Sequence, residues 1–127
     1  MSRMKITQAE AQIMEVLWRA DAPLAIEGLR AQLDEDWADG TVRAFMNRLL
    51  RKKAVAATKD GKRSLYRPLL ERRDYVVAES ETFLARVFQG EAAPLVAHFV
   101  KNRGLTPDDL RQLKAIIEDL EAKDDAE

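Results

Sequence analysis

Apolar residues recur every three or four positions in the first third of the chain, and this spacing predicts short amphipathic helices. The first begins at Thr7-Gln8-Ala9-Glu10, a capping box, and extends to about Ala20. Asp21-Ala22-Pro23 ends it, because proline disfavours helical backbone before it. A second, shorter helix follows on Leu24, Ile26, Leu29 and Leu33.

A third helix, from Thr41 to about Lys53, has two chemically different faces. Asp39 or Gly40 is expected to cap its start. One face is apolar at helical spacing and carries Val42, Phe45, Met46, Leu49 and Leu50. The opposite face is mostly polar and carries Arg43, Ala44, Asn47, Arg48 and Arg51. The helix is therefore predicted to pack one face on a core and to present the other to a polar partner.

The pattern changes from helical to extended after residue 53. Residues 55–58 and 64–67 are predicted as short strands around Lys59-Asp60-Gly61-Lys62, because Asp-Gly is a strong hairpin signal, and Pro68 ends the second strand. Three helices followed by a hairpin is the order of a winged helix-turn-helix, in which the third helix is the recognition helix and the hairpin is the wing. We predict a mainly α fold, with this winged helix in residues 1–70 and a helical dimerisation region in residues 71–127.

Three further helices are predicted in the second region. The first covers about residues 71–88 and ends at Gln89-Gly90, and the next lies around residues 95–100 and ends near Gly104. The last begins at Thr106-Pro107-Asp108-Asp109, with threonine as the cap, proline at the first helical position and carboxylates in the first turn.

The apolar face of these three helices is larger than they can enclose alone. A second copy of the chain would cover it, so the sequence predicts a homodimer. The alternative is that the helices fold back on the N-terminal module. The predicted dimer contacts are Val76, Phe83, Leu84, Val87, Phe88, Leu95, Val96, Phe99, Leu110, Leu113, Ile116, Ile117 and Leu120.

The distribution of charge indicates what the polar face of the third helix contacts. The chain has a net charge of −1, yet residues 41–73 contain eleven basic and two acidic residues, while the C-terminal end is acidic. Such a block is typical of a surface that meets a polyanion, although two solvated faces of opposite charge would give the same pattern.

Double-stranded DNA is the partner that this block predicts. Arg43, Asn47 and Arg48 suit base edges in the major groove, because arginine pairs with guanine and asparagine with adenine. Lys59, Lys62 and Arg63 at the hairpin suit phosphates. The competing hypothesis is a winged-helix protein–protein adaptor without DNA binding. In that case Trp18 or Trp37 would form a docking patch, whereas we expect both to anchor the core.

Other classes of function are not indicated. The chain has one histidine and no cysteine, and it lacks a glycine-rich phosphate loop, metal-ligand spacing and a nucleophile–base pair. We therefore expect no enzyme activity, no cofactor and no metal. There is no apolar run of membrane-spanning length and no signal-peptide stretch, so we expect no membrane insertion and a cytoplasmic location.

The chain resembles the BlaI/MecI/CopY family of bacterial repressors along nearly its whole length. The resemblance lies in residues 6–18, in Thr41-Val42-Arg43-Ala44-Phe45-Met46-Asn47-Arg48-Leu49, in the wing ending at Tyr66-Arg67-Pro68-Leu69, and in residues 95–99 and 105–110. It implies a homodimer on an inverted-repeat operator, with the C-terminal helices as the interface. The positions it implies for DNA contact are Thr41, Arg43, Ala44, Asn47 and Arg48, and we add Arg51, on the same polar face, as a sixth predicted contact.

The sequence departs from the family pattern in three places. The copper-responsive branch carries a cysteine metal motif, and this chain has no cysteine. In the antibiotic-responsive branch a membrane sensor triggers proteolysis at an Asn-Phe bond, and the matching position here is His98-Phe99. The family commonly has glycine after the recognition helix, where this chain has Lys53-Ala54. Because a left-handed helix end costs a non-glycine residue about 1 kcal/mol, we expect the helix to end differently here.

Overall fold

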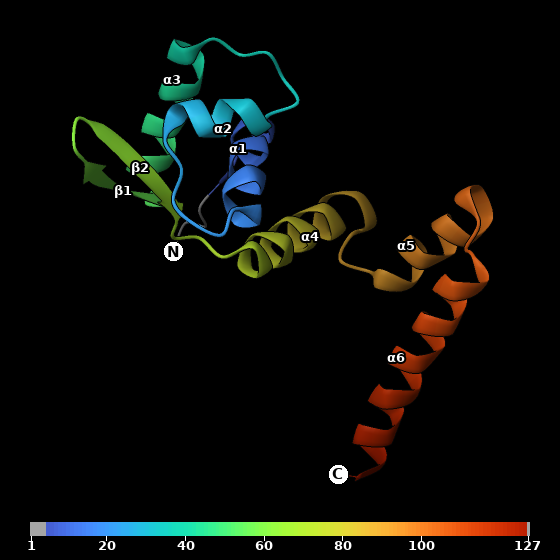
Figure 1. Cartoon of the computed structure of the whole chain (residues 1–127). Helices are drawn as coiled ribbons and strands as arrows, with labels where there is room; N and C mark the ends of the chain where they lie inside the picture. Colours follow the sequence, from blue (N-terminus) through green and yellow to red (C-terminus); the bar gives the residue numbers. More distant parts are fainter. Residues whose placement is uncertain (1–4, 127) are drawn as a thin grey trace. The chain divides into compact units, whose positions relative to one another are not determined.

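The computed structural model describes residues 5–126, which form two compact units, the first ending at Glu79 and the second beginning at Ser80. The first unit contains α1 (Gln8–Arg19), α2 (Ile26–Gln32), α3 (Asp39–Arg51), β1 (Val55–Asp60) and β2 (Arg63–Pro68) (Figure 1). Helix α4 (Arg72–Phe88) crosses the boundary. The second unit continues with α5 (Ala92–His98), the π-helical turn η1 (Phe99–Arg103) and α6 (Pro107–Ala126). The predicted fold, mainly helical with a hairpin after three helices, is confirmed.

Helix α1 begins at the predicted capping box. The Thr7 hydroxyl accepts a hydrogen bond from the Glu10 N–H at 3.2 Å, and Glu10 Oε1 accepts one from the Thr7 N–H at 2.8 Å. The helix ends at Arg19, where Ala20 takes an extended conformation. Both ends therefore lie within one residue of the prediction.

The start of α3 corrects the prediction for that helix. Its N-cap is Ala38, which makes no side-chain hydrogen bond, so neither Asp39 nor Gly40 caps it. Asp39 lies one position further on, in the first turn, and its carboxylate accepts a hydrogen bond from Arg43 Nε at 2.8 Å. A carboxylate there still favours the helix, because it faces the positive end of the helix dipole.

The end of α3 also differs from the expectation, since it takes the left-handed form without glycine. Lys53 has φ +63°, and its N–H donates to the Leu50 carbonyl at 3.0 Å. The Ala54 N–H donates to the Leu49 carbonyl at 3.0 Å. These two bonds form a Schellman motif, and the fully buried Leu49 and Ala54 side chains supply its apolar contact. This contact lies in the core, so packing holds Lys53 in the left-handed conformation.

The hairpin is confirmed, with longer strands than predicted. The antiparallel register runs from Val55 opposite Pro68 to Asp60 opposite Arg63, so the turn consists of Gly61 and Lys62. Gly61 has φ +68°, which suits the first turn position of a type II′ hairpin. A further bridge joins the hairpin to the segment before α2: the Leu24 N–H donates to the Tyr66 carbonyl at 3.0 Å, and the Tyr66 N–H donates to the Leu24 carbonyl at 2.8 Å.

A single apolar core fills the first unit between the three helices and the base of the hairpin. Trp18 and Trp37 pack against it as predicted, and Trp18 Nε1 donates to the Leu70 carbonyl at 2.8 Å. The largest fully buried side chains of this core are Ile13, Met14, Val16, Leu29, Val42, Met46 and Leu49.

The second unit consists of helices with the predicted ends. Gln89 at φ +51° and Gly90 at φ +82° follow α4, and α5 continues into η1 before Gly104. Thr106 caps α6, since its hydroxyl accepts from the Asp109 N–H at 3.0 Å and the Asp109 carboxylate accepts from the Thr106 N–H at 3.1 Å. Among the helices of residues 5–126, none has the length and apolar character needed to cross a membrane.

Candidate nucleic-acid interface

The outer face of α3 carries the predicted base-contacting residues. The apolar side of the helix is fixed in the core by Val42, Met46 and Leu49, each at most 1% exposed. This packing leaves the opposite side to solvent. The residues exposed there are the six predicted for DNA contact: Thr41, Arg43, Ala44, Asn47, Arg48 and Arg51.

Neighbouring side chains hold two of these arginines. Arg43 Nε lies 2.8 Å from Asp39 Oδ2, and this hydrogen bond and charge raise the pKa of Arg43 above its usual value. The guanidinium of Arg48 lies 5.5 Å from the centroid of the Phe45 ring, a cation–π contact. Phe45 packs in turn on Trp37, with ring centroids 5.1 Å apart. The helix therefore presents arginines that are already partly oriented.

The tip of the wing carries the predicted phosphate-contacting residues. Lys59, Lys62 and Arg63 are all exposed. Arg63 lies 3.6 Å from Asp60, with about 60% of each side chain exposed, so this ion pair is weak. In the described part of the chain, no carboxylate lies within 4.0 Å of the Lys59 or Lys62 ammonium group. Both lysines are therefore available to an external anion.

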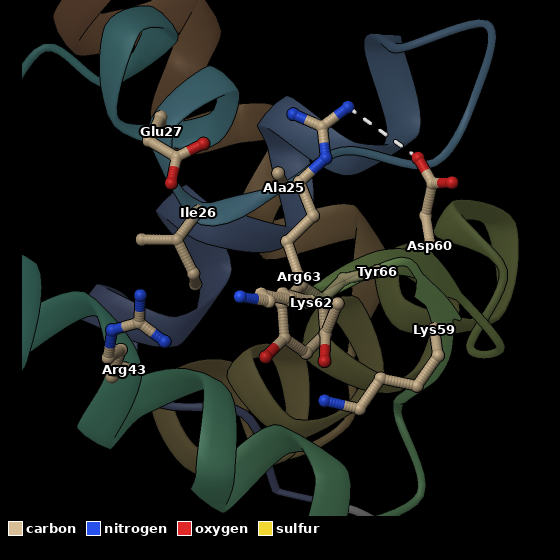
Figure 2. A pocket seen from close by; sticks show the side chains of 10 residues that line it. Ala25, Ile26, Glu27, Arg43, Lys59, Asp60, Lys62, Arg63 and Tyr66 are labelled. Atoms are coloured by element: carbon tan, nitrogen blue, oxygen red, sulfur yellow. Dashed lines mark ion pairs between the residues drawn. The ribbon is translucent and has the colours of Figure 1, made fainter.

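A groove of about 510 Å³ joins the recognition helix to the wing. Figure 2 shows Arg43 reaching into it from α3, and Lys59, Lys62 and Arg63 on the hairpin side. The groove thus brings together residues that the sequence assigned separately to bases and to phosphates. Its other lining residues are Ala25, Ile26, Glu27, Asp60, Ser64 and Tyr66.

The contribution of α2 to this groove was missed by sequence reasoning. Ala25, Ile26 and Glu27 reach the wing because the bridge between Leu24 and Tyr66 ties the start of α2 to β2. The two bridge residues are 42 positions apart in the sequence. No local pattern marks such a pairing, so no signal in the sequence could have found it.

Lys52, part of the predicted basic block, faces the interior instead of a polyanion. Its ammonium group lies 2.5 Å from Oε1 of Glu10, whose side chain is fully buried, and it donates to the Lys5 carbonyl at 2.8 Å. Burial raises the pKa of Glu10, but the hydrogen bonds from Lys52 and Thr7 outweigh it, so that the pKa lies below its usual value. Lys52 therefore ties the end of α3 to the start of α1.

The basic residues of segment 41–73 fall into two groups, those with an acidic partner and those without one. Arg43, Lys52, Arg63, Arg72 and Arg73 each have an acidic partner within 4.0 Å. The basic residues of the block that have no such partner among residues 5–126 are Arg48, Arg51, Lys53, Lys59, Lys62 and Arg67. The positive charge left for an external polyanion therefore lies on the outer face and end of α3 and on the wing.

The predicted dimer contacts lie on α4, α5, η1 and α6. Leu84, Phe88, Leu95 and Leu113 are half-buried within these helices. The remaining predicted contacts are between 38% and 58% exposed: Val76, Phe83, Val87, Val96, Phe99, Leu110, Ile116, Ile117 and Leu120. His98 and Phe99 lie at the junction of α5 and η1, where Asn102 Nδ2 donates to the His98 carbonyl at 3.1 Å.

Comparison with known proteins shows which family and which relatives the chain is similar to in sequence. The sequence model described as penicillinase repressor matches residues 6–119. The methicillin resistance regulatory protein MecI of Staphylococcus aureus strain N315 is 31% identical over 116 residues, which cover 89% of this chain and 93% of that protein.

Two solved structures are similar to more than half of the chain. The solution structure of the DNA-binding domain of the repressor BlaI has 26% identity and a TM-score of 0.51, and covers 59% of this chain and 94% of that one. The Bacillus licheniformis BlaI monomeric form in complex with the blaP half-operator has 26% identity and a TM-score of 0.50, with the same coverage.

Proposed function

The chain belongs to the penicillinase repressor family and is a DNA-binding transcriptional repressor, and from this premise we propose that it acts as a homodimer on an inverted-repeat operator. The family is one of repressors rather than enzymes. The observation that carries the proposal is the groove between α3 and the wing, where Arg43 from the exposed polar face of α3 meets three cationic side chains of the hairpin.

In this proposal α3 enters the major groove of the operator. Arg43, Asn47 and Arg48 contact base edges, Thr41, Ala44 and Arg51 lie along the same surface, and the wing residues Lys59, Lys62 and Arg63 contact phosphates. The division follows from chemistry, because bidentate arginine and asparagine discriminate bases while lysine ammonium groups neutralise phosphates without regard to sequence.

A second copy of the chain completes the operator complex. One BlaI monomeric form is described with a half-operator, which suggests one chain for each half of a repeated site. The exposed apolar residues of α4 to α6 support the same conclusion, because a monomer rarely leaves such a face uncovered. We assign the dimer interface to these helices.

Release from the operator is proposed to follow cleavage of the His98–Phe99 bond by a protease linked to a membrane sensor. The bond is exposed, at the end of α5, and a cut there would separate α6 from the winged helix. Incubation with the activated sensor protease of the same organism should yield two fragments whose ends map to His98 and Phe99. An intact chain would contradict this part of the proposal.

Footprinting on the DNA upstream of the protein's own gene, at two salt concentrations, tests the function. We expect a protected inverted repeat, and an affinity that falls by roughly 10³–10⁵ between 50 and 200 mM salt if about 6–10 phosphates are contacted. A folded dimer that protects nothing at low salt would favour the adaptor instead, with Trp18, Trp37 and the acidic C-terminal end as the surfaces to examine next.

Single substitutions separate the two kinds of contact. Arg43→Ala or Asn47→Ala should reduce the preference for the operator over other DNA by about 1–3 kcal/mol. Lys62→Ala should weaken binding to all sequences alike and reduce the salt slope by about one. Equal losses of preference in all three variants would contradict this assignment of roles.

A further inference from the structure

An acidic residue stands at the start of the cationic recognition helix and contacts two arginines. One carboxylate oxygen of Asp39 accepts the hydrogen bond from Arg43 Nε at 2.8 Å, and the other lies 3.8 Å from Arg30 Nη1. Arg30 is itself held, because its Nε donates to the Trp37 carbonyl at 3.0 Å. Asp39 therefore links α2, the turn before α3 and the first exposed arginine of α3.

The hydrogen bond to Asp39 uses only one side of the Arg43 guanidinium. Within residues 5–126, no other side chain or carbonyl forms a hydrogen bond with Arg43. Its two terminal nitrogens therefore keep the parallel N–H pair that binds guanine O6 and N7 in bidentate fashion. Figure 2 shows the guanidinium facing the groove, opposite Glu27 on α2.

Such a carboxylate affects specific and non-specific DNA binding in opposite directions. An arginine already held in one rotamer loses less conformational entropy when it binds a base edge, which favours the correct sequence. A negative charge beside the phosphates disfavours every sequence, because binding to phosphates is electrostatic and does not depend on the bases. The helix dipole explains an acid in the first turn but not its contacts with two arginines.

We propose that Asp39 is a positioning residue that orients Arg43 for base recognition and raises operator specificity at the cost of overall DNA affinity. The inference rests on the proposed function, since it requires Arg43 to contact a base. It concerns a residue that makes no contact with DNA in the proposed complex and acts through Arg43.

The test compares Asp39→Ala with Asp36→Ala in the full-length chain. Asp36 is an exposed acid in the segment just before α3, with no cationic group within 4.0 Å among residues 5–126, so it matches the change in charge but not the contact. Fluorescence anisotropy gives the Kd for the operator recovered by footprinting and for an unrelated duplex of the same length, at several salt concentrations. Thermal melting followed by circular dichroism checks that each variant is folded.

We expect Asp39→Ala to bind the unrelated duplex about 2–5-fold more tightly, with a salt slope steeper by up to one. The Kd for the unrelated duplex divided by the Kd for the operator should fall about tenfold. Asp36→Ala should strengthen both complexes alike and keep the ratio. Asp39→Glu should restore most of the ratio, because the longer carboxylate still reaches Arg43. The inference would be overturned if Asp39→Ala had the same ratio of the two Kd values as the unaltered chain. It would also be overturned if Asp36→Ala lost as much of this ratio as Asp39→Ala.

A double variant identifies the route of the effect. If Asp39 acts through Arg43, then Asp39→Ala causes no further loss of specificity in an Arg43→Ala background. An additive loss would overturn the positioning role. The proposed function fails separately, when the unaltered chain itself does not distinguish its operator from the unrelated duplex.

Discussion

The two units of this protein differ in where their apolar side chains lie. In residues 5–79, Ile13, Met14 and Leu49 are fully buried in a closed core, whereas none of residues 80–125 is buried. In α6 the apolar residues Ile116, Ile117 and Leu120 are each more than half exposed. Both regions have helices with defined ends, so the difference lies in tertiary packing and not in secondary structure.

The difference shows that the same apolar pattern on a helix can lead either to a closed core within one unit or to a face that its own unit does not cover. An apolar stripe on α1 or α3 packs against other elements of the same unit, and the stripe on α6 has no such cover within its own unit. Hydrophobic periodicity predicts which residues leave water but not what covers them. In the proposed function a second copy supplies the cover for the C-terminal helices.

The largest effect should come from a charge placed in the proposed dimer face. Ile117→Asp puts a carboxylate where the partner would bury it, and we expect the dimer Kd to rise about a thousandfold, which corresponds to about 4 kcal/mol. Sedimentation equilibrium measures the change. Ala115→Asp introduces the same charge on the other side of α6 and should leave the dimer intact, and a dimer that tolerates both variants would remove the basis for this interface.

The second prediction contrasts the same residue type in the two units. Ile13→Ala opens a cavity in the closed core and should lower the free energy of unfolding by about 3 kcal/mol. Ile116, which is 56% exposed, should change it by less than about 0.5 kcal/mol when replaced by alanine in the monomeric Ile117→Asp background. Urea unfolding measures both, and similar losses would mean that the second unit has a core of its own.

The third prediction contrasts a partly buried ion pair with an exposed one. Lys52→Met leaves the buried Glu10 carboxylate without its cation and should lower the free energy of unfolding by about 2 kcal/mol at pH 7. Arg111→Met removes the exposed pair with Asp108 on α6 and should have no measurable effect. A loss from Arg111→Met as large as that from Lys52→Met would contradict the contrast.

The effect of Lys52→Met should depend on pH. In the unaltered chain the pKa of Glu10 lies below its usual value, so the stability it contributes is present above that value and is lost as the pH falls through the lowered pKa. In Lys52→Met the hydrogen bond and charge of Lys52, which lower the pKa of Glu10, are absent, so this pKa should be higher than in the unaltered chain and less of the stability of the variant should depend on an ionised Glu10. The difference between the two chains should therefore shrink from pH 7 to about pH 4, and a constant difference would show that Glu10 is not its cause.

The fold was predictable from the sequence where the governing interactions are local. The capping box at Thr7, the Thr106 cap and the helical spacing of Val42, Met46 and Leu49 all act within one or two turns of the chain. The same spacing placed the candidate DNA contacts on the exposed side of α3, because the position of the buried residues determines the opposite face.

The sequence failed where distant residues decide the structure. Charge alone assigned Lys52 to the polyanion surface, but Glu10, 42 positions earlier, draws it to the interior. Asp39 was predicted only as a possible cap, and its contact with Arg30, nine positions earlier on α2, has no marker in the sequence. The partial orientation of the recognition arginines was missed for a different reason, because Asp39 and Phe45 lie four and three positions before Arg43 and Arg48 on the same helix, a local spacing that the sequence does contain.

The smallest effect concerns the left-handed residues other than glycine, of which residues 5–126 contain one in each unit: Lys53 at φ +63° and Gln89 at φ +51°. Lys53→Gly should raise the free energy of unfolding of the N-terminal unit by about 0.5–1 kcal/mol, because glycine adopts this conformation without a steric penalty. Lys53→Ala loses the same side chain but keeps the penalty, so it should give no gain. Gln89→Gly should leave the melting of the N-terminal unit unchanged, since Gln89 lies outside the closed core. Melting curves of the three variants measure the contrast. A gain from Lys53→Ala equal to that from Lys53→Gly would mean that loss of the lysine side chain, and not relief of backbone strain, stabilises the end of the recognition helix.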